Sequence, residues 1–356
     1  MPPRSRRQHL VSKFYLKGFA NSDGRLFRTP LSGQAHPVSL NDATVVNDYY
    51  SVDFGEGLSD LFERAFGDIE KPAAVAWAQM TAGRIPEPDG RVAAASWIAL
   101  QYLRSDALRS IATETRAGLI RLVVSINGKS GLRRHIEKAE GSPISDRRLD
   151  AEWKDIIKPG GPTLEHDVIG HMRHVLDLLP DATAMILSSP WMMLVGGQTL
   201  VTCDHPVYLI RDPDGPDWGG VGLATAGGIG LSVSRRVGLI VLTKQLAGDH
   251  DGVATGSHET GMLLNRDIVS NTRRALYHHP SDKPREWFGG TLPEPRDREM
   301  APIGDSLISE DGWTANGSRE DASAPQSPVS GADNDGATLS DLEWPIEGRV
   351  FDYHEA

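Results

Sequence analysis

The stretch AMILSSPWMMLVGGQTLVTCDHPVYLI, residues 184–210, marks a change in how apolar residues are spaced along the chain. Before it, apolar residues recur at helical spacing. Within it, short apolar runs are separated by glycine and proline, which is typical of strands. The pair Gly196-Gly197 lies between two such runs and favours a two-residue hairpin. The stretch therefore predicts that a helical half is followed by an antiparallel sheet.

The flanking segments extend this pattern in both directions. Helical spacing covers residues 58–80, 91–126 and 165–179. Pro72 predicts a kink in the first of these or a short break between two helices, and Pro180 predicts the end of the third. Strand patterns follow at 228–234 and 237–244, and a closing helix is expected over 261–277. We predict an α+β fold in one domain over residues 1–280, helical over 1–183, with the sheet and closing helix over 184–280.

Composition limits the class of protein. The 356 residues include one cysteine, Cys203, which excludes an internal disulfide and a cysteine-based zinc site and fits a reducing compartment. The basic N-terminus is followed by no apolar signal region, and no apolar run is long enough to cross a membrane. We expect a cytoplasmic protein with no membrane partner.

The negative charge is confined to one end of the chain. The net charge of −11 is that of residues 281–356, which hold six Lys and Arg against 17 Asp and Glu and leave 31 of each sign in residues 1–280. Overall charge therefore does not support nucleic-acid binding, although a basic face on the neutral part is possible. We predict that 281–356 is a disordered acidic tail. Its segment 341–355 contains three aromatic residues and is either a docking segment for the body or a protein partner, or simply a mobile terminus.

Asp204 and His205 follow a buried strand pattern and precede Pro206. Proline cannot donate to a β-ladder, so strand pairing should end there, with Asp204 and His205 at the exit. Loops at strand ends often carry reactive groups. Asp-x-Pro is also an ordinary turn sequence in which the aspartate accepts backbone N–H bonds, and this second interpretation is favoured.

Glu63 and Glu70 are two helical turns apart and so face the same way, about 10 Å apart along the axis. Gln101 and Arg104 are neighbours on the next helix. If the helices pack together, Arg104 can pair with one glutamate and leave the other free. A buried ion pair that joins the two helices is the favoured interpretation, and a catalytic role is the alternative.

Histidines supply two further candidates. His9 precedes an aromatic helix, with Ser12 as its expected N-cap, and packing on that helix explains it adequately. Asp167, His171 and His174 share one helical face and resemble a metal triad. Their spacing is not that of a known zinc motif, and we favour a polar helix edge.

Three segments together resemble the family known as domain of unknown function 4238: QHLVSKFYLKGFA from Gln8, FERAFGDIEKPAA with LQYLRS in the helices, and TCDHPV in the sheet. The positions that match the family pattern are His9, Phe14, Leu16, Phe19, Tyr50, Glu63, Glu70, Gln101, Arg104, Asp204 and Pro206. The chain departs from the pattern at Ser12, where the family has proline, and at Cys203, where it has serine. The resemblance covers about residues 8–277. It implies a shared fold and brings no activity with it.

Two functions are compatible with these residues. In the first, the protein is a metal-dependent hydrolase for a phosphoester-type bond. Glu63, Glu70 and Asp204 would then bind a divalent metal ion, Arg104 would neutralise developing charge, and His9, Gln101 and His205 would complete the site. In the second, the protein is a non-catalytic recognition or effector protein and the same polar network is structural. An open site shared by these groups would favour the first, and buried, mutually paired groups would favour the second.

Overall fold

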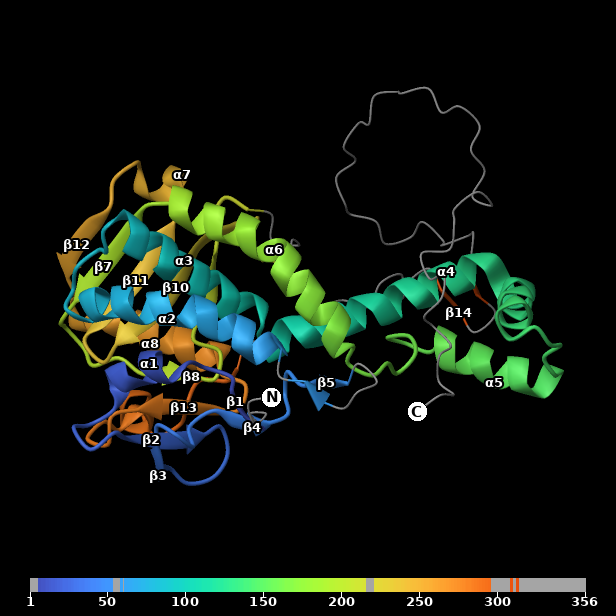
Figure 1. The fold of residues 1–356 in the computed structure, drawn as a ribbon, viewed down its shortest axis with the longest axis horizontal. Helices are drawn as coiled ribbons and strands as arrows, with labels where there is room; N and C mark the ends of the chain where they lie inside the picture. Colours follow the sequence, from blue (N-terminus) through green and yellow to red (C-terminus); the bar gives the residue numbers. More distant parts are fainter. Residues whose placement is uncertain are drawn as a thin grey trace. The chain divides into compact units, whose positions relative to one another are not determined.

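The computed structural model describes residues 6–53, 58–59, 61–215, 221–295, 308–309 and 312–313 (Figure 1). Contacts divide the chain into two compact units, one of Met1–Ser110 with His166–Glu299 and one of Ile111–Glu165 with Met300–Ala356. The sequence predicts one domain over 1–280, and residues 111–165 of that range fall in the second unit. The predicted α+β class is confirmed. The expected docking segment, 341–355, lies outside the described residues.

A five-stranded sheet is the centre of the first unit. Its order is β12 (Gly252–Thr255), β7 (Trp191–Val195), β11 (Val237–Leu242), β10 (Ala226–Ser234) and β9 (Tyr208–Arg211). All neighbours are antiparallel except β12 and β7, which are parallel. All nine residues of β10 are buried. A Cβ atom at Gly230 would lie 2.2 Å from the ring of Tyr208, so glycine is required there.

Helices cover both faces of this sheet (Figure 1). Leu239 and Val241 share one core with α2 (Leu61–Thr81), α3 (Pro88–Leu103) and α6 (Val168–Ser188). Ile240 packs instead with the core of α8 (His258–Asn271), because successive residues of a strand point to opposite faces.

Two prolines lie inside these helices. Pro72 lies within α2, and α6 continues past Pro180, so the prediction that Pro180 ends the helix was wrong. The helix continues because Ala182 and Ile186, which follow the proline, are buried in the core.

The second sheet has four antiparallel strands in the order β3 (His36–Ser39), β2 (Arg25–Pro30), β13 (Ala275–His278) and β8 (Thr202–Cys203). The predicted hairpin at Gly196-Gly197 is therefore wrong, because β7 and β8 belong to different sheets. Glycine is still needed at 197, where φ is +71° and a Cβ atom would lie 2.5 Å from the carbonyl oxygen of Gly256. The closing helix is also shorter than predicted, since residues 275–278 form β13.

Short elements complete this unit: β1 (Arg7–His9) with β4 (Val45–Asn47), β5 (Val52–Asp53) with β6 (Leu58–Ser59), α1 (Lys13–Leu16), the 3-10 helix η1 (Lys17–Phe19), α7 (Lys244–Ala247) and α9 (Pro284–Trp287). Helix α9 lies within the segment predicted as tail. The described residues there are held in place, since Arg235 donates two hydrogen bonds, of 2.9 and 2.7 Å, to Asp282.

The second unit contains α5 (Asp146–Ile157), the short strands β14 (Ile308–Ser309) and β15 (Gly312–Trp313), and most of α4 (Asp106–Glu140). Helix α4 is interrupted at Gly128, where φ is +67°. The core of the second unit consists of nine buried residues: Ile120, Val124, Leu132, Ile136, Ile144, Leu149, Trp153, Ile156 and Ile157. No helix among the described residues is both long enough and apolar enough to cross a membrane.

Candidate functional site

Arg104 follows α3 as its C-cap residue and is only 1% exposed. Its Nη2 atom donates to Oε1 of Glu70 at 3.0 Å, to Oε1 of Gln101 at 2.9 Å and to Oγ of Ser12 at 3.3 Å. These acceptors lie on α2, on α3 and at the start of α1. One buried cation therefore connects three helices. We call Ser12, Glu70, Gln101 and Arg104, with His9 and Glu63, the Arg104 cluster.

Ser12 and Gln101 attach the N-terminal segment to this cluster. The Ser12 hydroxyl donates to Oε1 of Glu70 at 2.6 Å and accepts from Nε1 of Trp97 at 2.8 Å. Ser12 occupies the predicted N-cap position of α1, but its side chain makes no capping bond; its oxygen accepts instead from Nε1 of Trp97 and Nη2 of Arg104. Gln101 donates from Nε2 to the carbonyl oxygen of Leu10 at 2.8 Å.

Aromatic rings and carboxylates surround the Arg104 guanidinium. Its Cζ atom lies 5.2 Å from the ring centre of Phe66 and 5.9 Å from that of Tyr50. Burial opposes the charge of Arg104, but Tyr50, Glu70 and Glu63 act against this and raise its pKa. Burial also raises the pKa of Tyr50 to about 12, so the phenol stays protonated at neutral pH. Arg104 therefore carries a permanent buried charge that the two glutamates stabilise.

His9 ends β1 at the edge of the Arg104 cluster. Its Nε2 atom is buried and has no hydrogen-bond partner among the described residues. Burial and the nearby Lys13 lower its pKa, while Glu70 acts in the opposite direction. His9, Glu63, Glu70, Gln101 and Arg104, five of the seven residues proposed from the sequence, thus come together.

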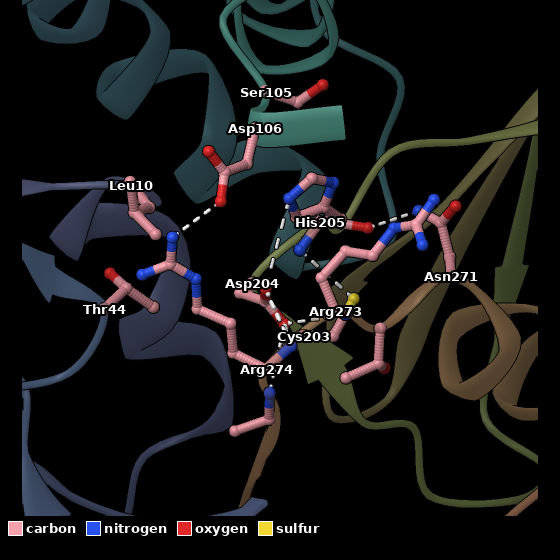
Figure 2. Close-up of polar contacts among 12 residues, drawn as sticks. Leu10, Thr44, Ser105, Asp106, Cys203, Asp204, His205, Asn271, Arg273 and Arg274 are labelled. Carbon is pink, nitrogen blue, oxygen red and sulfur yellow. Dashed lines mark hydrogen bonds and ion pairs between the residues drawn. The ribbon is translucent and has the colours of Figure 1, made fainter. Parts of the chain in front are cut away.

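Asp204 belongs to a different network (Figure 2). It is 3% exposed, and its Oδ1 atom accepts from the backbone N–H groups of Arg273, Arg274 and Ala275 at 3.3, 3.1 and 3.2 Å. Its Oδ2 atom accepts from Arg274 N at 3.1 Å. The aspartate does bind backbone amides, but in a segment about 70 residues later rather than in its own turn. It fixes the start of β13.

His205 is buried beside Asp204 (Figure 2). Its Nε2 atom lies 4.0 Å from Oδ2 of Asp204, and its carbonyl oxygen accepts from Nδ2 of Asn271 at 2.5 Å. Its backbone N–H donates to Sγ of Cys203 at 3.3 Å. The backbone of His205 is therefore bound to β8 and to the end of α8.

Asp106, which was not singled out from the sequence, lies near His205 (Figure 2). It accepts from the Tyr49 hydroxyl at 2.5 Å and from Nη2 of Arg274 at 2.6 Å. Although burial opposes it, these hydrogen bonds lower the pKa of the Asp106 carboxyl, so Asp106 is ionised at neutral pH. Asp106 is the first residue of α4. Because the spacing over 91–126 predicts one unbroken helix, the start of a helix at Asp106 was not predicted.

The three residues of the possible metal triad lie at the start of helix α6, and their surroundings differ. Asp167 is the N-cap of α6 and accepts from Gly170 N at 2.8 Å, and His174 is exposed. His171 is 7% exposed, so its predicted place on a polar helix edge was wrong. Neither of its ring nitrogens has a hydrogen-bond partner among the described residues. Burial, assisted by Arg109, lowers its pKa to about 4.

The described residues do not offer a metal site. No group of three or more His, Cys, Asp or Glu side chains among them is placed to hold a metal ion. Glu70 is bound to Arg104 and Ser12, and Asp204 is bound to backbone amides. The donor set proposed from Glu63, Glu70 and Asp204 therefore does not fit a divalent cation in this arrangement.

Comparison with known proteins identifies a family. Residues 7–282 match the family model described as a protein of unknown function (DUF4238). No curated protein and no solved structure matches the chain. Because the matched region is most of the chain and contains both networks described above, the resemblance noted from the sequence is confirmed. The chain belongs to the DUF4238 family.

Proposed function

We propose that the chain is a recognition or effector protein whose buried polar residues are structural. The observation that carries this proposal is that the charged groups of Arg104 and Asp204 are both bound within the protein. Arg104 connects three helices, and the Asp204 carboxylate is bound by three backbone amides. Groups committed in this way hold the protein together and are not available to a substrate.

The exposed edge of the Arg104 cluster supports a binding role. Glu70 has 28% of its side chain exposed, and His9 and Glu63 are also partly exposed. The position of Glu70 is set by its hydrogen bond from the buried Arg104. A rigid support that presents ionisable groups at its edge suits contact with a ligand or a partner surface.

Paired measurements of stability and turnover test the proposal. Glu70→Gln and Asp204→Asn should each lower the melting temperature. The wild type should show no turnover of a phosphoester panel above that of these variants, with or without divalent cations. Turnover that is lost in Glu70→Gln while the melting temperature stays at the wild-type value would contradict a structural role.

A hydrolase remains the second candidate, and one observation favours it. His9 has a lowered pKa, an Nε2 atom without a partner among the described residues, and Glu70 nearby. A neutral imidazole beside a carboxylate is the usual arrangement of a general base. This version uses His9 directly and needs no metal site. Turnover that survives chelation by EDTA and is lost in His9→Ala would support it.

A cytoplasmic location is also part of the proposal. Cys203 is a free, buried thiol, which suits a reducing compartment. Fractionation of the native host with an antibody to the chain tests this, and recovery in an extracellular or periplasmic fraction would contradict it.

A further inference from the structure

The edges of the two larger sheets differ in how they are protected from pairing with other chains. A free edge strand exposes backbone N–H and C=O groups, and the usual protection is a proline, a bulge, a charged side chain or a very short strand. Among the described residues, β3 contains Pro37, and β8 has only two residues and is followed closely by Pro206. Strand β9 ends at Arg211 and pairs with β10 through an irregular register between Ala226 and Gly228. Three of the four edges are therefore protected.

Strand β12 forms the fourth edge and lacks most of this protection. Its sequence, Gly-Val-Ala-Thr over residues 252–255, contains no charge and no proline, and its register with β7 has no bulge. Only its length of four residues limits pairing. Figure 1 shows β12 at the margin of its sheet, where β7 is its neighbour. Val253, Ala254 and Thr255 are exposed, Val253 to 55%, so this edge is open to a further strand.

The outer side of β12 presents a defined set of hydrogen-bonding groups. The backbone N–H of Gly256 donates to the carbonyl oxygen of Val195 at 2.9 Å, so Gly256 is turned toward β7. The directions of N–H and C=O groups alternate along a strand, and Val253 and Thr255 are therefore turned away from β7. No described residue outside this sheet forms a backbone hydrogen bond with either of them. Two donors and two acceptors thus point outward, with Ala254 between them.

We propose that β12 pairs with the same strand of a second copy of this chain, antiparallel and about a two-fold axis at Ala254. In this register Val253 lies opposite the partner's Thr255, and each such pair exchanges two N–H···O bonds. Ala254 lies opposite the partner's Ala254 on the axis. Val and Thr are β-branched residues that suit cross-strand pairs, and no like charges meet within the strands. The two five-stranded sheets become continuous.

The symmetry of the edge favours a second copy over a foreign strand. Pairing about Ala254 matches every outward donor with an acceptor, because the axis places the two outward residues opposite each other. Asp251, next to the strand, accepts from Nη2 of Arg91 at 3.0 Å, so its charge is compensated within the same chain. A contact through one short strand buries little area, and the dimer is therefore expected to be weak and reversible. This inference goes beyond the proposed function and does not depend on it.

The dependence of mass on concentration tests the dimer. In sedimentation equilibrium of the full-length protein from low to high micromolar concentration, the average mass should rise from that of one chain towards twice that value. Val253→Lys combined with Thr255→Lys should stay at the mass of one chain, because lysines would then lie opposite lysines. Val253→Glu combined with Thr255→Lys should dimerise, because opposite charges face each other. Val75→Lys, at an exposed position on α2, is the control and should dimerise as the wild type does.

Cysteine substitutions test the register. Opposite residues of a non-hydrogen-bonded antiparallel pair have Cα atoms about 4.5 Å apart, and disulfides span about 4.4–6.8 Å. Ala254→Cys should therefore form a disulfide-linked dimer under mild oxidation. Val253→Cys meets its symmetry mate diagonally at about 7–8 Å and should cross-link about tenfold more slowly. The native Cys203 is buried and does not compete.

Three results would overturn the proposal. A wild type that keeps the mass of one chain at every concentration leaves this edge to a strand of another protein. A dimer that persists in Val253→Lys with Thr255→Lys places the contact elsewhere, and so do equal cross-linking rates of the two cysteine variants. If the double lysine variant does not fold, the cross-linking rates decide. The stability and turnover tests on Glu70 and Asp204 are separate measurements, so either proposal can fail alone.

Discussion

The Nη2 atom of Arg104 lies 3.0 Å from Oε1 of Glu70, and the same carboxylate oxygen accepts the Ser12 hydroxyl at 2.6 Å. The two charges differ in their surroundings, since the Arg104 side chain is 1% exposed and that of Glu70 is 28% exposed. The buried Arg104 cation therefore loses more stabilisation when the pair is broken than the Glu70 carboxylate does, because water can solvate Glu70 in part. Removing the carboxylate charge leaves a buried cation with less compensation.

A double-mutant cycle measures this pair. Glu70→Gln should lower the free energy of unfolding by about 2 kcal/mol, because Gln still accepts the hydrogen bonds but carries no charge. Arg104→Met should also destabilise the protein, and the double variant should be more stable than the sum of the single changes by about 1–3 kcal/mol. Chemical denaturation provides these values. Asp68→Asn removes an exposed carboxylate on the same helix and should change stability by less than about 0.5 kcal/mol. Strict additivity at Glu70 and Arg104 would show that the pair is not coupled.

Asp204→Asn should weaken the junction between β8 and β13. The neutral amide provides one acceptor oxygen in place of the charged carboxylate that binds three backbone N–H groups. We expect a loss of about 2–3 kcal/mol. Hydrogen exchange should quicken at the amides of Arg274 and Ala275. Unchanged exchange at these two amides would contradict the assigned role, and Asp249→Asn, at an exposed position, is the control.

Gly230→Ala tests the packing of β10 on β9. The new Cβ atom would lie 2.2 to 2.5 Å from the Tyr208 ring, and the ring is fully buried. Overpacking of this kind costs about 1–3 kcal/mol. Gly67→Ala in α2 meets nothing within 4 Å and should instead stabilise the protein by about 0.5–1 kcal/mol. Thermal unfolding of the two variants should give shifts of opposite sign, and shifts of the same sign would refute the comparison.

Acid should destabilise the protein partly through His171. Its pKa is about 4 in the folded state and 6.5 in the unfolded state, so above pH 6.5 it is neutral in both and its effect on stability is constant. Between pH 6.5 and 4 the unfolded chain takes up a proton that the folded chain does not. The free energy of unfolding therefore falls as pH falls, by about 3 kcal/mol in total from this residue.

His171→Phe should reduce this loss of unfolding free energy at acidic pH. Burial lowers the pKa of His9 and His278 as well, so a smaller loss of the same sign remains in the variant. The slope of unfolding free energy against pH, measured by denaturation between pH 4 and 7, is compared with that of His36→Phe, which removes an exposed histidine. Equal slopes in the two variants would contradict a depressed pKa at His171.

The sequence predicted the fold class well because apolar spacing reports burial directly. Strands β10 and β11 and the helices α2, α6 and α8 overlap the ranges that the spacing predicts. Errors arose where long-range packing outweighs a local signal. Pro180 did not end α6 because Ala182 and Ile186 are buried beyond it, and Gly196-Gly197 did not form a hairpin because the chain crosses between sheets there.

The site was predicted only in part, for a similar reason. The i, i+3 and i, i+7 spacings predicted which side chains share a helix face, Gln101 with Arg104 and Glu63 with Glu70, because such spacings are properties of single helices. The pairing of Arg104 with Glu70 joins two helices, and the sequence predicted it only on the condition that these helices pack together. The partners of Asp204 could not be predicted because they are backbone groups of residues 273–275, which have no side-chain signature. Asp106 was missed, and His171 was wrongly placed on a polar helix edge, because the surroundings of both residues come from elements that are far apart in the sequence.

The pairing of β2 with β13 has a consequence for synthesis of the chain. Residues 27–30 find their partners at 275–278, so the ribosome must add about 250 residues before this pairing can form. Until then one edge of the β2–β3 hairpin offers unpaired backbone groups, which are prone to association with other chains. Nascent chains of this protein should therefore rely on chaperones until β13 leaves the exit tunnel, and fragments that stop before residue 275 should be poorly soluble.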